Sequence, residues 1–257
     1  MVFFIEVNKD KEKAVNLYRN LLTFLHDNKQ FITKDVSKTD FILSLGGDGT
    51  FIRTANKYRK YGKPILGINC GTLGYLTELN PDNYKEKLLK LFNNNYSIHN
   101  RIGIEGSVYE ITKEACNDVY IRNNSMSVID FCILVDNNYL ATFKADGVII
   151  STPMGSTGYA LSCGGSFVDP DSDVILLNLI APHTLMNRSI ILNSNSEIKI
   201  IIKEVRGNCE IAIDGDIVRK LNNKDEIIIR KSNIPTKIAE IDQRNFINLI
   251  SSKLINN

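Results

Sequence analysis

The pattern of apolar residues changes near Asn95, and this change limits the fold more than any other feature of the chain. Before it, short apolar runs alternate with a segment of helical spacing, in which Val15, Tyr18, Leu22 and Leu25 recur every three or four residues. After it, strand-like runs follow one another with short connections. Alternating strands and helices favour a parallel sheet flanked by helices, whereas successive strands favour antiparallel sheets. We therefore predict an α/β N-terminal domain with a Rossmann-like parallel sheet, followed by a β-rich C-terminal domain.

The boundaries of the expected elements follow from the same pattern. In the first domain we predict strands at 2–7, 41–45 and 64–69 and helices at 11–27 and 51–61. In the second domain we predict strands at 103–112, 119–121, 128–135, 140–144, 174–180, 197–205, 209–213 and 226–230. Asp136–Asn138 and Arg206–Asn208 are typical of hairpin turns. A helix at 246–254 is expected to pack back on the first domain, which gives domains of 1–95 with 238–257 and of 96–237.

Composition narrows the class of protein. The 257 residues are 43% hydrophobic and carry a formal net charge of +2, without a run of Lys and Arg that would indicate nucleic-acid binding. No apolar run has the length of a signal peptide or a membrane span, so we expect a cytoplasmic protein without a membrane partner. The five cysteines are scattered and form no CxxC pair, which favours free buried thiols over disulfides or a zinc site.

The first candidate site is the run Gly46-Gly47-Asp48-Gly49-Thr50, which follows a predicted strand. Glycines let the backbone approach an anion closely, and the helix behind them directs N–H groups and a partial positive charge at it. We expect Thr50 to cap this helix and Arg53 to add a positive charge near phosphates. A carboxylate beside phosphates is unfavourable unless it accepts a proton or organises a cation, which makes Asp48 informative. The alternative is an ordinary glycine-rich turn with Asp as the turn former.

Two further loops are candidates. Asn69–Thr77 leaves the third predicted strand and should lie beside the first loop, because the carboxyl ends of parallel strands converge. Within it Tyr75 either stacks on a ring or fills the core, and we favour the core. The longer stretch Lys144–Ser162 opens from a buried strand into a loop rich in Gly, Ser and Thr, with a helix near Thr157. Its amides and hydroxyls suit a nucleobase and ribose, whereas the alternative is a polar loop with capping residues.

These segments, together with Asn117-Asp118 and Ala181-Pro182-His183-Thr184-Leu185, resemble the NAD kinase family in order and spacing, over about Phe41–Asp216. GGDGT alone is shared with lipid kinases and phosphofructokinase-like enzymes. The stretch from Asp146 to Ser162 with the Pro-His-Thr-Leu run is more specific to NAD kinases. Neither a Walker motif nor a protein-kinase motif set is present.

The resemblance implies a role for each matching residue. Asp48 would be the general base for the 2′-hydroxyl of the adenosine ribose, beside Gly49, and the active site would lie in the interdomain cleft. Asn117 and Asp118 would hold ribose and adenine groups. The remaining expected contacts to the dinucleotide and the donor are Gly46, Gly47, Thr50, Arg53, Tyr75, Lys144, Asp146, Thr157, Gly158, Tyr159 against adenine, Ala160, Leu161, Ser162, Ala181 and Asp216.

Three positions depart from the family's pattern. Asp118 replaces Glu and reaches about one methylene less, Gly158 replaces Ala at a helix start, and Asp216 stands where the family often has a neutral or His side chain. His183 invites a catalytic interpretation, but we favour a buried, hydrogen-bonded structural role.

The resemblance predicts an NAD kinase that uses NAD and ATP, or another phosphoryl donor, with Mg²⁺. No residue is assigned as a metal ligand. The alternatives are a lipid kinase that shares the GGDGT loop and a dinucleotide sensor without catalysis.

A homodimer or homotetramer is expected. The run Ile198–Ile202 is either an apolar sheet edge that forms the contact between subunits or ordinary sheet core.

Overall fold

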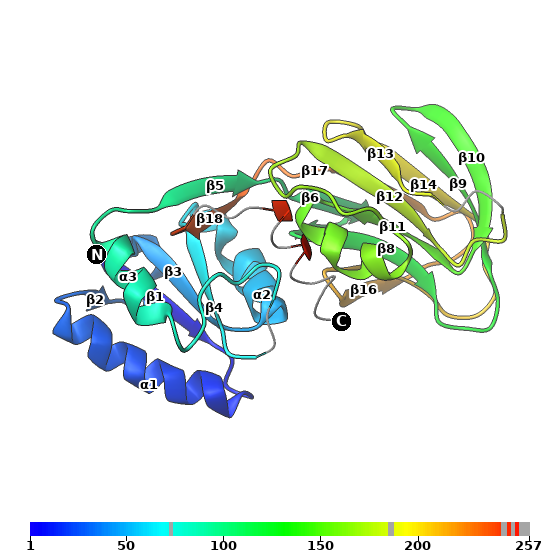
Figure 1. Cartoon of the computed structure of the whole chain (residues 1–257). Helices are drawn as coiled ribbons and strands as arrows, with labels where there is room; N and C mark the ends of the chain where they lie inside the picture. The colour runs from blue at the N-terminus through cyan, green and yellow to red at the C-terminus, as the bar shows by residue number, and fades with distance from the viewer. Residues whose placement is uncertain (72–73, 185–187, 243–245, 248–249, 252–257) are drawn as a thin grey trace. The chain divides into compact units, whose positions relative to one another are not determined.

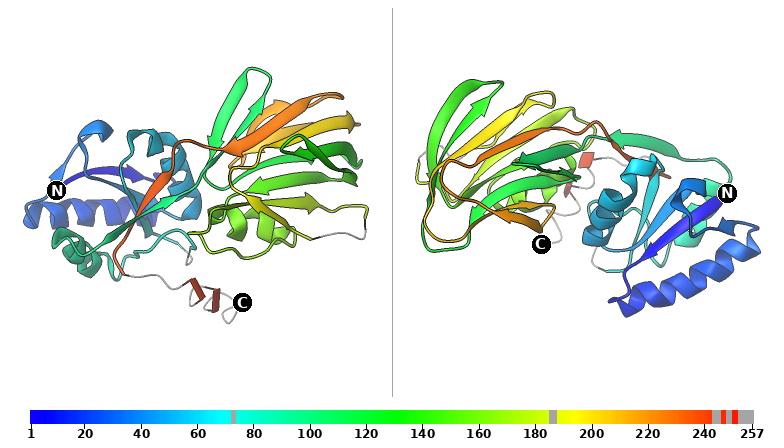
Figure 2. Two further views of the ribbon diagram at one scale, coloured as in Figure 1. Left: turned by 90° about the horizontal axis from the view of Figure 1, so that it is seen from above. Right: turned by 180° about the vertical axis from the view of Figure 1, so that it is seen from behind.

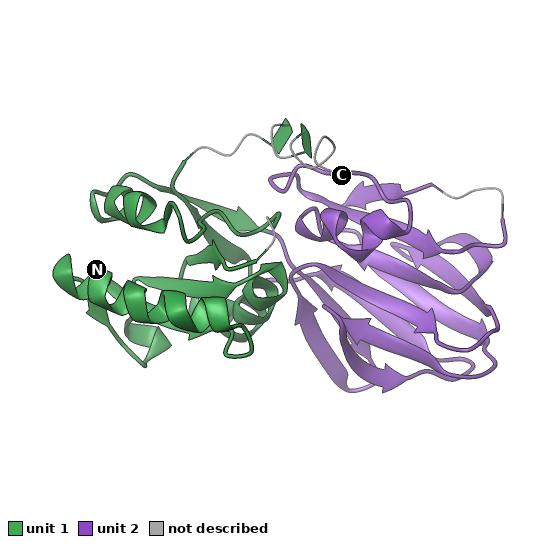
Figure 3. Ribbon diagram, turned by 60° about the horizontal axis from the view of Figure 1, so that its bottom comes forward, with its two compact units in different colours: residues 1–101, 234–257 green, residues 102–233 purple. Residues whose placement is uncertain are grey.

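The computed structural model describes residues 1–71, 74–184, 188–242, 246–247 and 250–251. The chain divides into two compact units, of which unit 1 comprises 1–101 with 234–257 and unit 2 comprises 102–233 (Figure 3). The predicted boundaries were 95/96 and 237/238. The difference arises because the strands at 97–101 and 236–240 both belong to the sheet of unit 1.

Unit 1 is a six-stranded sheet flanked by helices, with strand order β2-β1-β3-β4-β18-β5 (Figure 1). Its core strands are parallel, as predicted, but β5 runs antiparallel to β18, so the sheet is mixed. The strands are β1 (Val2–Val7), β2 (Phe31–Ile32), β3 (Phe41–Gly46), β4 (Ile65–Asn69), β5 (Ser97–Arg101) and β18 (Thr236–Glu240). The helices are α1 (Glu12–Asp27), α2 (Asp48–Tyr58) and α3 (Tyr84–Phe92), with short 3₁₀ turns η1 (Val36–Lys38) and η2 (Arg59–Tyr61).

The central strand β3 explains how the helices attach to this sheet. All six of its residues are buried, which is typical of a parallel strand covered on both faces. Phe41, Leu43 and Leu45 share a core with α1 and α3. On the opposite face the Ser44 and Thr54 hydroxyls are 3.0 Å apart, which joins the strand to α2. Figure 1 shows α1 and α3 on one side of the sheet and α2 on the other.

Unit 2 consists of two antiparallel six-stranded sheets, in the orders β10-β9-β14-β17-β6-β7 and β13-β12-β11-β8-β15-β16 (Figure 2). One apolar core holds buried residues from both sheets, so the unit is a sandwich. The β-rich prediction is thus confirmed. The elements are β6 (Ile104–Val108), β7 (Ile111–Ala115), β8 (Asp118–Asn123), β9 (Ile129–Val135), β10 (Asn138–Ala145), β11 (Gly147–Ser151), η3 (Met154–Thr157), α4 (Tyr159–Ser162), β12 (Val174–Ile180), β13 (Ile190–Asn193), β14 (Ile198–Glu204), β15 (Cys209–Ile213), β16 (Asp216–Lys220) and β17 (Glu226–Lys231).

The two predicted hairpin turns have different outcomes. Asp136 and Asn137 have φ of 51° and 63° and connect the paired strands β9 and β10, so this hairpin is confirmed. The prediction for Arg206–Asn208 was wrong, because β14 and β15 belong to different sheets. Gly207, with φ of 94°, lies in the segment that connects the two sheets. Turn-forming residues mark a change of chain direction, and such a change occurs in connections between sheets as well as in hairpins.

Other expectations about the chain are also resolved. Ile198, Ile200 and Ile202 are buried in β14, which lies between β9 and β17, so this run is sheet core and not an edge. All five cysteines are free, and all but Cys163 are buried. Among the described residues no helix is long and apolar enough to cross a membrane. The predicted helix at 246–254 falls largely outside the described residues, of which 246–247 and 250–251 are helical.

Candidate functional site

The glycine-rich loop leads directly from β3 into α2. Gly46 ends the strand, Gly47 is the residue before the helix, and the helix begins at Asp48 and not at the predicted 51. Thr50 therefore lies inside the first turn and does not cap the helix; its hydroxyl accepts a hydrogen bond from Asn8 Nδ2 at 3.1 Å. A Cβ at Gly46 would lie 2.3 Å from Thr50 Oγ1, so only glycine fits there. The Thr50 and Phe51 N–H groups donate to the Gly47 carbonyl at 2.9 and 3.0 Å. The N–H groups that precede them at the start of a helix lack partners within the helix, which leaves them for an anion.

The Asp48 side chain joins this loop to the loop after β4, as the convergence of the parallel strands predicted. Its Oδ2 accepts the Tyr75 N–H at 2.6 Å, and its Oδ1 accepts the Leu76 N–H at 3.2 Å and the Thr77 hydroxyl at 3.3 Å. The Cys70 N–H also donates to the Gly46 carbonyl at 2.7 Å. These bonds hold the carboxylate in one orientation at the carboxyl edge of the sheet.

Two cations lie beside the glycines. Arg53 is exposed, and its Nη1 is 4.0 Å from the point where a Gly49 Cβ would lie. The Lys11 Nζ is 3.5 Å from the corresponding point at Gly47 and 3.4 Å from that at Gly71. Sequence reasoning missed Lys11. The signal was available, because Lys11 follows β1 and so lies at the same carboxyl edge as the two loops.

Tyr75 is not a core residue, contrary to the interpretation that we favoured. Its side chain is half-buried and does not belong to the apolar core of the described part of unit 1. Its backbone N–H donates to Asp48 Oδ2, so the residue lies in the loop that orients the Asp48 carboxylate.

A second group of site residues lies in unit 2, at the start of β8. Asp214 occupies the tip of the β15–β16 hairpin with φ of 47°. Its carboxylate accepts the N–H groups of Cys116, Asn117 and Asp118 at 2.7, 2.8 and 2.9 Å. Asn117 Oδ1 is buried, and no residue that the structure describes gives it a hydrogen bond. A buried acceptor of this kind is costly unless a ligand supplies a donor. Sequence reasoning missed Asp214, because its hydrogen-bond partners lie almost 100 residues earlier in the sequence.

Asp118 has an unusual electrostatic environment. Its side chain is 5% exposed. Burial, with a smaller contribution from the Asp214 carboxylate, raises the pKa of Asp118 to about 7. Near neutral pH this carboxyl group is therefore divided between a form that only accepts hydrogen bonds and a form that also donates one.

The loop after β11 packs against the same segment. The Thr152 hydroxyl donates to the Cys116 carbonyl at 2.6 Å, and the Thr152 N–H donates to the Asn117 carbonyl at 2.8 Å. A Cβ at Gly155 would lie 2.2 Å from that same carbonyl oxygen. At Gly158 the nearest atoms would be the Gly155 oxygen at 3.2 Å and Asn117 Nδ2 at 3.6 Å. The 3₁₀ turn η3 thus begins before the predicted position at Thr157 and α4 begins just after it, at Tyr159, and together they carry the segment from Thr157 to Ser162 past Asn117.

The aromatic residue of this segment has a partner on β8. Tyr159 and Tyr120 meet edge to face, with ring centroids 5.2 Å apart and an interplanar angle of 81°. The Arg122 guanidinium interacts electrostatically with Tyr159 and with Cys163. Sequence reasoning missed Tyr120 and Arg122. Strand alternation from Asp118 offered a signal, because residues two apart share a face.

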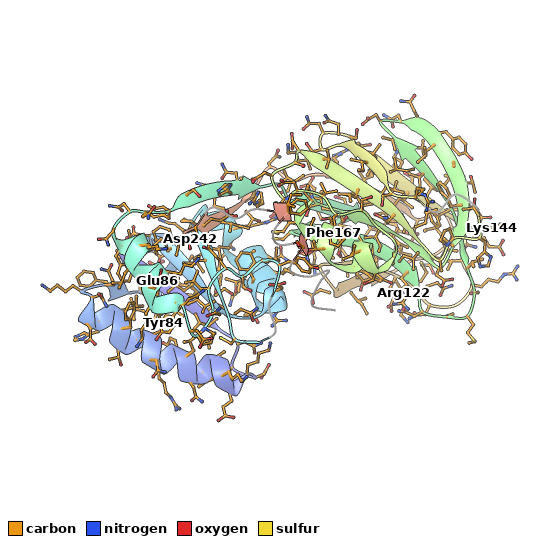
Figure 4. The ribbon with its side chains drawn as sticks, viewed as in Figure 1. Tyr84, Glu86, Arg122, Lys144, Phe167 and Asp242 are labelled. Carbon is orange, nitrogen blue, oxygen red and sulfur yellow. The ribbon has the colours of Figure 1, made fainter. Side chains whose placement is uncertain are left out.

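Of the remaining predicted residues of unit 2, Ala160 belongs to the small apolar cluster against which Tyr120 and Tyr159 pack, and the Asp216 carboxylate interacts electrostatically with Tyr120. The others lie outside these described contacts. Lys144 on β10 is exposed and 3.9 Å from Asp130, and Figure 4 shows it apart from Arg122. Asp146 connects β10 to β11, and its carbonyl accepts the Asn123 N–H at 2.9 Å. Ala181 is exposed with φ of 43°, and Asp216 is exposed at the start of β16. Of the segment from Thr157, Ala160 is buried, Leu161 is half-buried and Ser162 is exposed.

The interpretation of His183 as a buried, hydrogen-bonded residue was wrong. Its side chain is exposed, and among the described residues only its backbone N–H makes a hydrogen bond, to the Lys144 carbonyl at 2.8 Å. The run from Ala181 to Thr184 continues past the end of β12 onto the surface, which explains the difference. The rest of the Pro-His-Thr-Leu run, Leu185, lies outside the described residues.

Comparison with known proteins places this geometry in a family. Residues 4–96 match the model of the ATP-NAD kinase N-terminal domain, and residues 116–241 match that of the ATP-NAD kinase C-terminal domain. A protein of Fusobacterium nucleatum named NAD kinase is 37% identical over 255 residues, which cover 96% of this chain and 94% of that protein. An NAD kinase of Thermoanaerobacter sp. is 36% identical over 273 residues, with 96% of each chain covered.

Two solved structures share the fold. The yeast NADH kinase complexed with NADH superposes with a TM-score of 0.89 at 24% identity, covering 100% of this chain and 88% of its own. An NAD kinase from Archaeoglobus fulgidus in complex with ATP gives a TM-score of 0.81 at 23% identity, covering 100% and 98%.

Proposed function

This chain belongs to the NAD kinase family and is an enzyme that phosphorylates NAD, and we propose that Asp48 is the general base that activates the 2′-hydroxyl of the adenosine ribose. In this reaction the 2′-oxygen attacks the terminal phosphorus of ATP. The bond from that phosphorus to the bridging oxygen breaks as the new P–O bond forms, and Asp48 takes the hydroxyl proton. The products are NADP, ADP and a proton.

The orientation of Asp48 is the observation that carries this proposal. Three donors from residues 75–77 fix the carboxylate at the first turn of α2. The N–H groups at the very start of a helix have no partner within it and are proposed to bind phosphate oxygens. A base must lie within hydrogen-bonding reach of its proton, and a fixed carboxylate beside a phosphate site meets this condition once the hydroxyl arrives. Gly46, Gly47, Gly49, Thr50 and Arg53 are proposed to line the site of the transferred phosphate.

The cluster in unit 2 is proposed to bind the dinucleotide. The partnerless Asn117 oxygen is an acceptor for an amino or hydroxyl group, Asp118 is a second polar contact, and Tyr159 offers an aromatic face to adenine. The other proposed contacts are Tyr75, Lys144, Asp146, Thr157, Gly158, Ala160, Leu161, Ser162, Ala181 and Asp216. We propose that Asp48 and this cluster act on one NAD molecule in an interdomain cleft.

Mg²⁺ is proposed to enter with the donor. Among the described residues no three His, Cys, Asp or Glu side chains lie close enough together to hold a metal ion. The Asp48 oxygens already accept hydrogen bonds from residues 75–77. The phosphate oxygens of ATP are therefore the main ligands expected for the cation, and its role is to neutralise charge on the transferred phosphoryl group.

We also propose that the enzyme is a homodimer or homotetramer. The strand β16 is at the edge of its sheet and carries Ile217, which is 62% exposed. Exposed edge strands offer unpaired backbone groups to a second chain. Sedimentation of the purified protein gives the assembly state directly.

The test of the proposed base compares the wild type with Asp48→Asn. With NAD, ATP and Mg²⁺, the wild type should form NADP, detected by an NADP-specific dehydrogenase. Removal of a positioned base costs about 10²–10⁴-fold in turnover, so the variant should bind NAD normally and react very slowly. Near-normal turnover by Asp48→Asn would refute the role of Asp48.

A further inference from the structure

Glu78 is a buried carboxylate that the roles proposed for Asp48 and for the dinucleotide cluster leave unused. It comes directly after residues 75–77, which supply the three donors to Asp48. Its side chain is 7% exposed, although a charged side chain normally stays in water unless it has partners. The partners of Glu78 therefore show what the residue does.

Glu78 accepts two backbone N–H groups at the end of β18. Its Oε2 accepts the Ile241 N–H at 3.0 Å, and its Oε1 accepts the Asp242 N–H at 3.0 Å. Both residues come directly after Glu240, the last residue of β18. Backbone N–H groups beyond the end of a strand are no longer paired by the sheet and need another acceptor. One carboxylate thus fastens the loop after β4 to the end of β18, about 160 residues later in the chain.

Lys87 of α3 compensates the charge of Glu78. Its Nζ is 3.2 Å from Glu78 Oε1, and it also pairs with the Asp242 carboxylate. Burial lowers the pKa of Lys87, but the hydrogen bond to Asp242 and the Glu78 charge outweigh burial and raise it, so the ammonium stays charged. Lys90 bridges Glu86 and Asp242 at 3.4 and 3.1 Å (Figure 4). Within the described part of the chain Lys90 forms no ion pair with Glu78.

The far end of the same loop is fixed on β4. The Leu79 N–H donates to the Gly67 carbonyl at 3.1 Å, and the Leu79 carbonyl accepts the Asn69 N–H at 2.7 Å. Thr77 packs on the same strand, because a Cβ at Gly67 would lie 2.7 Å from Thr77 Cγ2. Without the Glu78 carboxylate the loop would be attached to β4 alone, and the two N–H groups after β18 would lose their acceptor.

We propose that Glu78 is a positioning residue for phosphoryl transfer. By holding the loop at the end of β18, it keeps the Tyr75 and Leu76 N–H groups at the oxygens of Asp48, and so keeps that carboxylate in its orientation. Glu78 acts through the loop and not on the reacting atoms. The inference rests on the proposed role of Asp48 as the base, but the attachment of the loop to Asp48 is measurable without turnover.

The experiment compares Glu78→Ala and Glu78→Gln with the wild type, each with and without Asp48→Asn. Glu78→Ala removes both acceptor oxygens, whereas Glu78→Gln keeps the size of the side chain and one acceptor oxygen. Lys90→Met is the matched control, because it removes an ammonium from the same cluster but leaves the contacts of Glu78 in place. The measurements are kcat and KM for NADP formation, the calorimetric dissociation constant of NAD, and hydrogen exchange of the amides of residues 75 and 76. Normal NAD affinity shows that a variant is folded.

Glu78→Ala should accelerate exchange of both amides and lower kcat by about 10-fold to 10²-fold, since a shift of about 1 Å at a reacting group costs about 10²-fold. NAD affinity and the KM for NAD should stay unchanged. Glu78→Gln should lose less activity than Glu78→Ala, and Lys90→Met should match the wild type. In the Asp48→Asn background, Glu78→Ala should cause little further loss of kcat.

Unchanged amide exchange or unchanged kcat in Glu78→Ala overturns the inference, as does a Glu78→Gln enzyme less active than Glu78→Ala. A loss of equal size with and without Asp48→Asn also overturns it, because a purely structural role of Glu78 would lower the activity of both enzymes alike. Near-normal turnover by Asp48→Asn, or absence of NADP formation by the wild type, would instead count against the proposed function and leaves the exchange result intact.

Discussion

Gly74 lies against the carboxylate of Asp48, and a Cβ at position 74 would be 2.1 Å from Asp48 Oδ1 and 2.6 Å from its Cγ. Real side chains do not approach so closely, so any residue other than glycine must displace the carboxylate or the loop. The proposed base therefore depends on a glycine 26 positions later in the chain as much as on its own helix.

This relationship predicts the effect of Gly74→Ala. The added methyl group should move the Asp48 carboxylate from its place at the N–H groups of residues 75 and 76. A displacement of about 1 Å at a reacting group costs about 10²-fold, so kcat should fall by that order while NAD affinity is retained. Steady-state kinetics with both substrates and a direct NAD titration make the comparison.

The double variant Gly74→Ala/Asp48→Asn serves as the control. If Gly74→Ala acts through Asp48, the second change should add little to the loss caused by Asp48→Asn alone. Additive losses would show that the glycine matters for a different reason.

Two glycines of unit 2, Gly155 and Gly158, test how the dinucleotide cluster is supported. A Cβ at Gly155 would lie 2.2 Å from the Asn117 carbonyl oxygen, which also accepts the Thr152 N–H. Gly155→Ala should lower the free energy of unfolding by about 3 kcal/mol, a typical cost of overpacking, and weaken NAD binding. At Gly158 the tightest approach is 3.2 Å, so Gly158→Ala should cost less than about 1 kcal/mol. Urea unfolding of both variants measures the difference, and equal losses would contradict it.

The interior strands of unit 1 were predictable because both of their faces are buried. β1 and β3 are short apolar runs between polar segments, and their bounds agree with the prediction to within one residue. β5 was missed, because Ser97–Arg101 is polar and lies at the edge of the sheet. Its pairing with β18, and the buried Arg101–Glu240 ion pair at 2.9 Å, join segments about 140 residues apart. A pattern within a short stretch of sequence does not predict a contact between residues so far apart in the chain.

The candidate site shows the same limit. Asp48 stood out because a carboxylate among glycines is chemically unusual, and the adjacent loop followed from parallel topology. Asp214 was missed, and Asp216, two residues later, was assigned to the site. Asp214 acts through backbone N–H groups of a distant strand, whereas Asp216 is exposed on the hairpin. The two carboxylates belong to the same hairpin, and only the pairing of the strands in the folded protein shows which one accepts the N–H groups of residues 116–118.

Removal of the Asp214 carboxylate should loosen the start of β8. Asp214→Ala leaves the N–H groups of residues 116–118 without their acceptor, and hydrogen bonds to a charged group contribute about 1.5–3 kcal/mol each. We expect NAD affinity to fall at least 10-fold and hydrogen exchange of these three amides to accelerate. The Asp216→Ala variant, on an exposed residue of the same hairpin, is the control for stability. Unchanged exchange in Asp214→Ala would show that the hairpin does not hold this segment.

The pKa of Asp118 predicts a pH dependence of stability. Because burial and the Asp214 charge raise the folded-state pKa to about 7 from 3.8, the folded state holds a proton that the unfolded state has released. This contribution to stability is complete below about pH 4, declines as the pH rises, and is lost above about pH 7. Asp118→Asn removes the buried charge, so its advantage over the wild type should grow between pH 5 and 8. Each pKa unit corresponds to about 1.4 kcal/mol, which sets an upper limit of about 4 kcal/mol at pH 8. Urea unfolding of both proteins at pH 5, 6, 7 and 8 measures the difference, and a constant difference across this range would contradict the raised pKa.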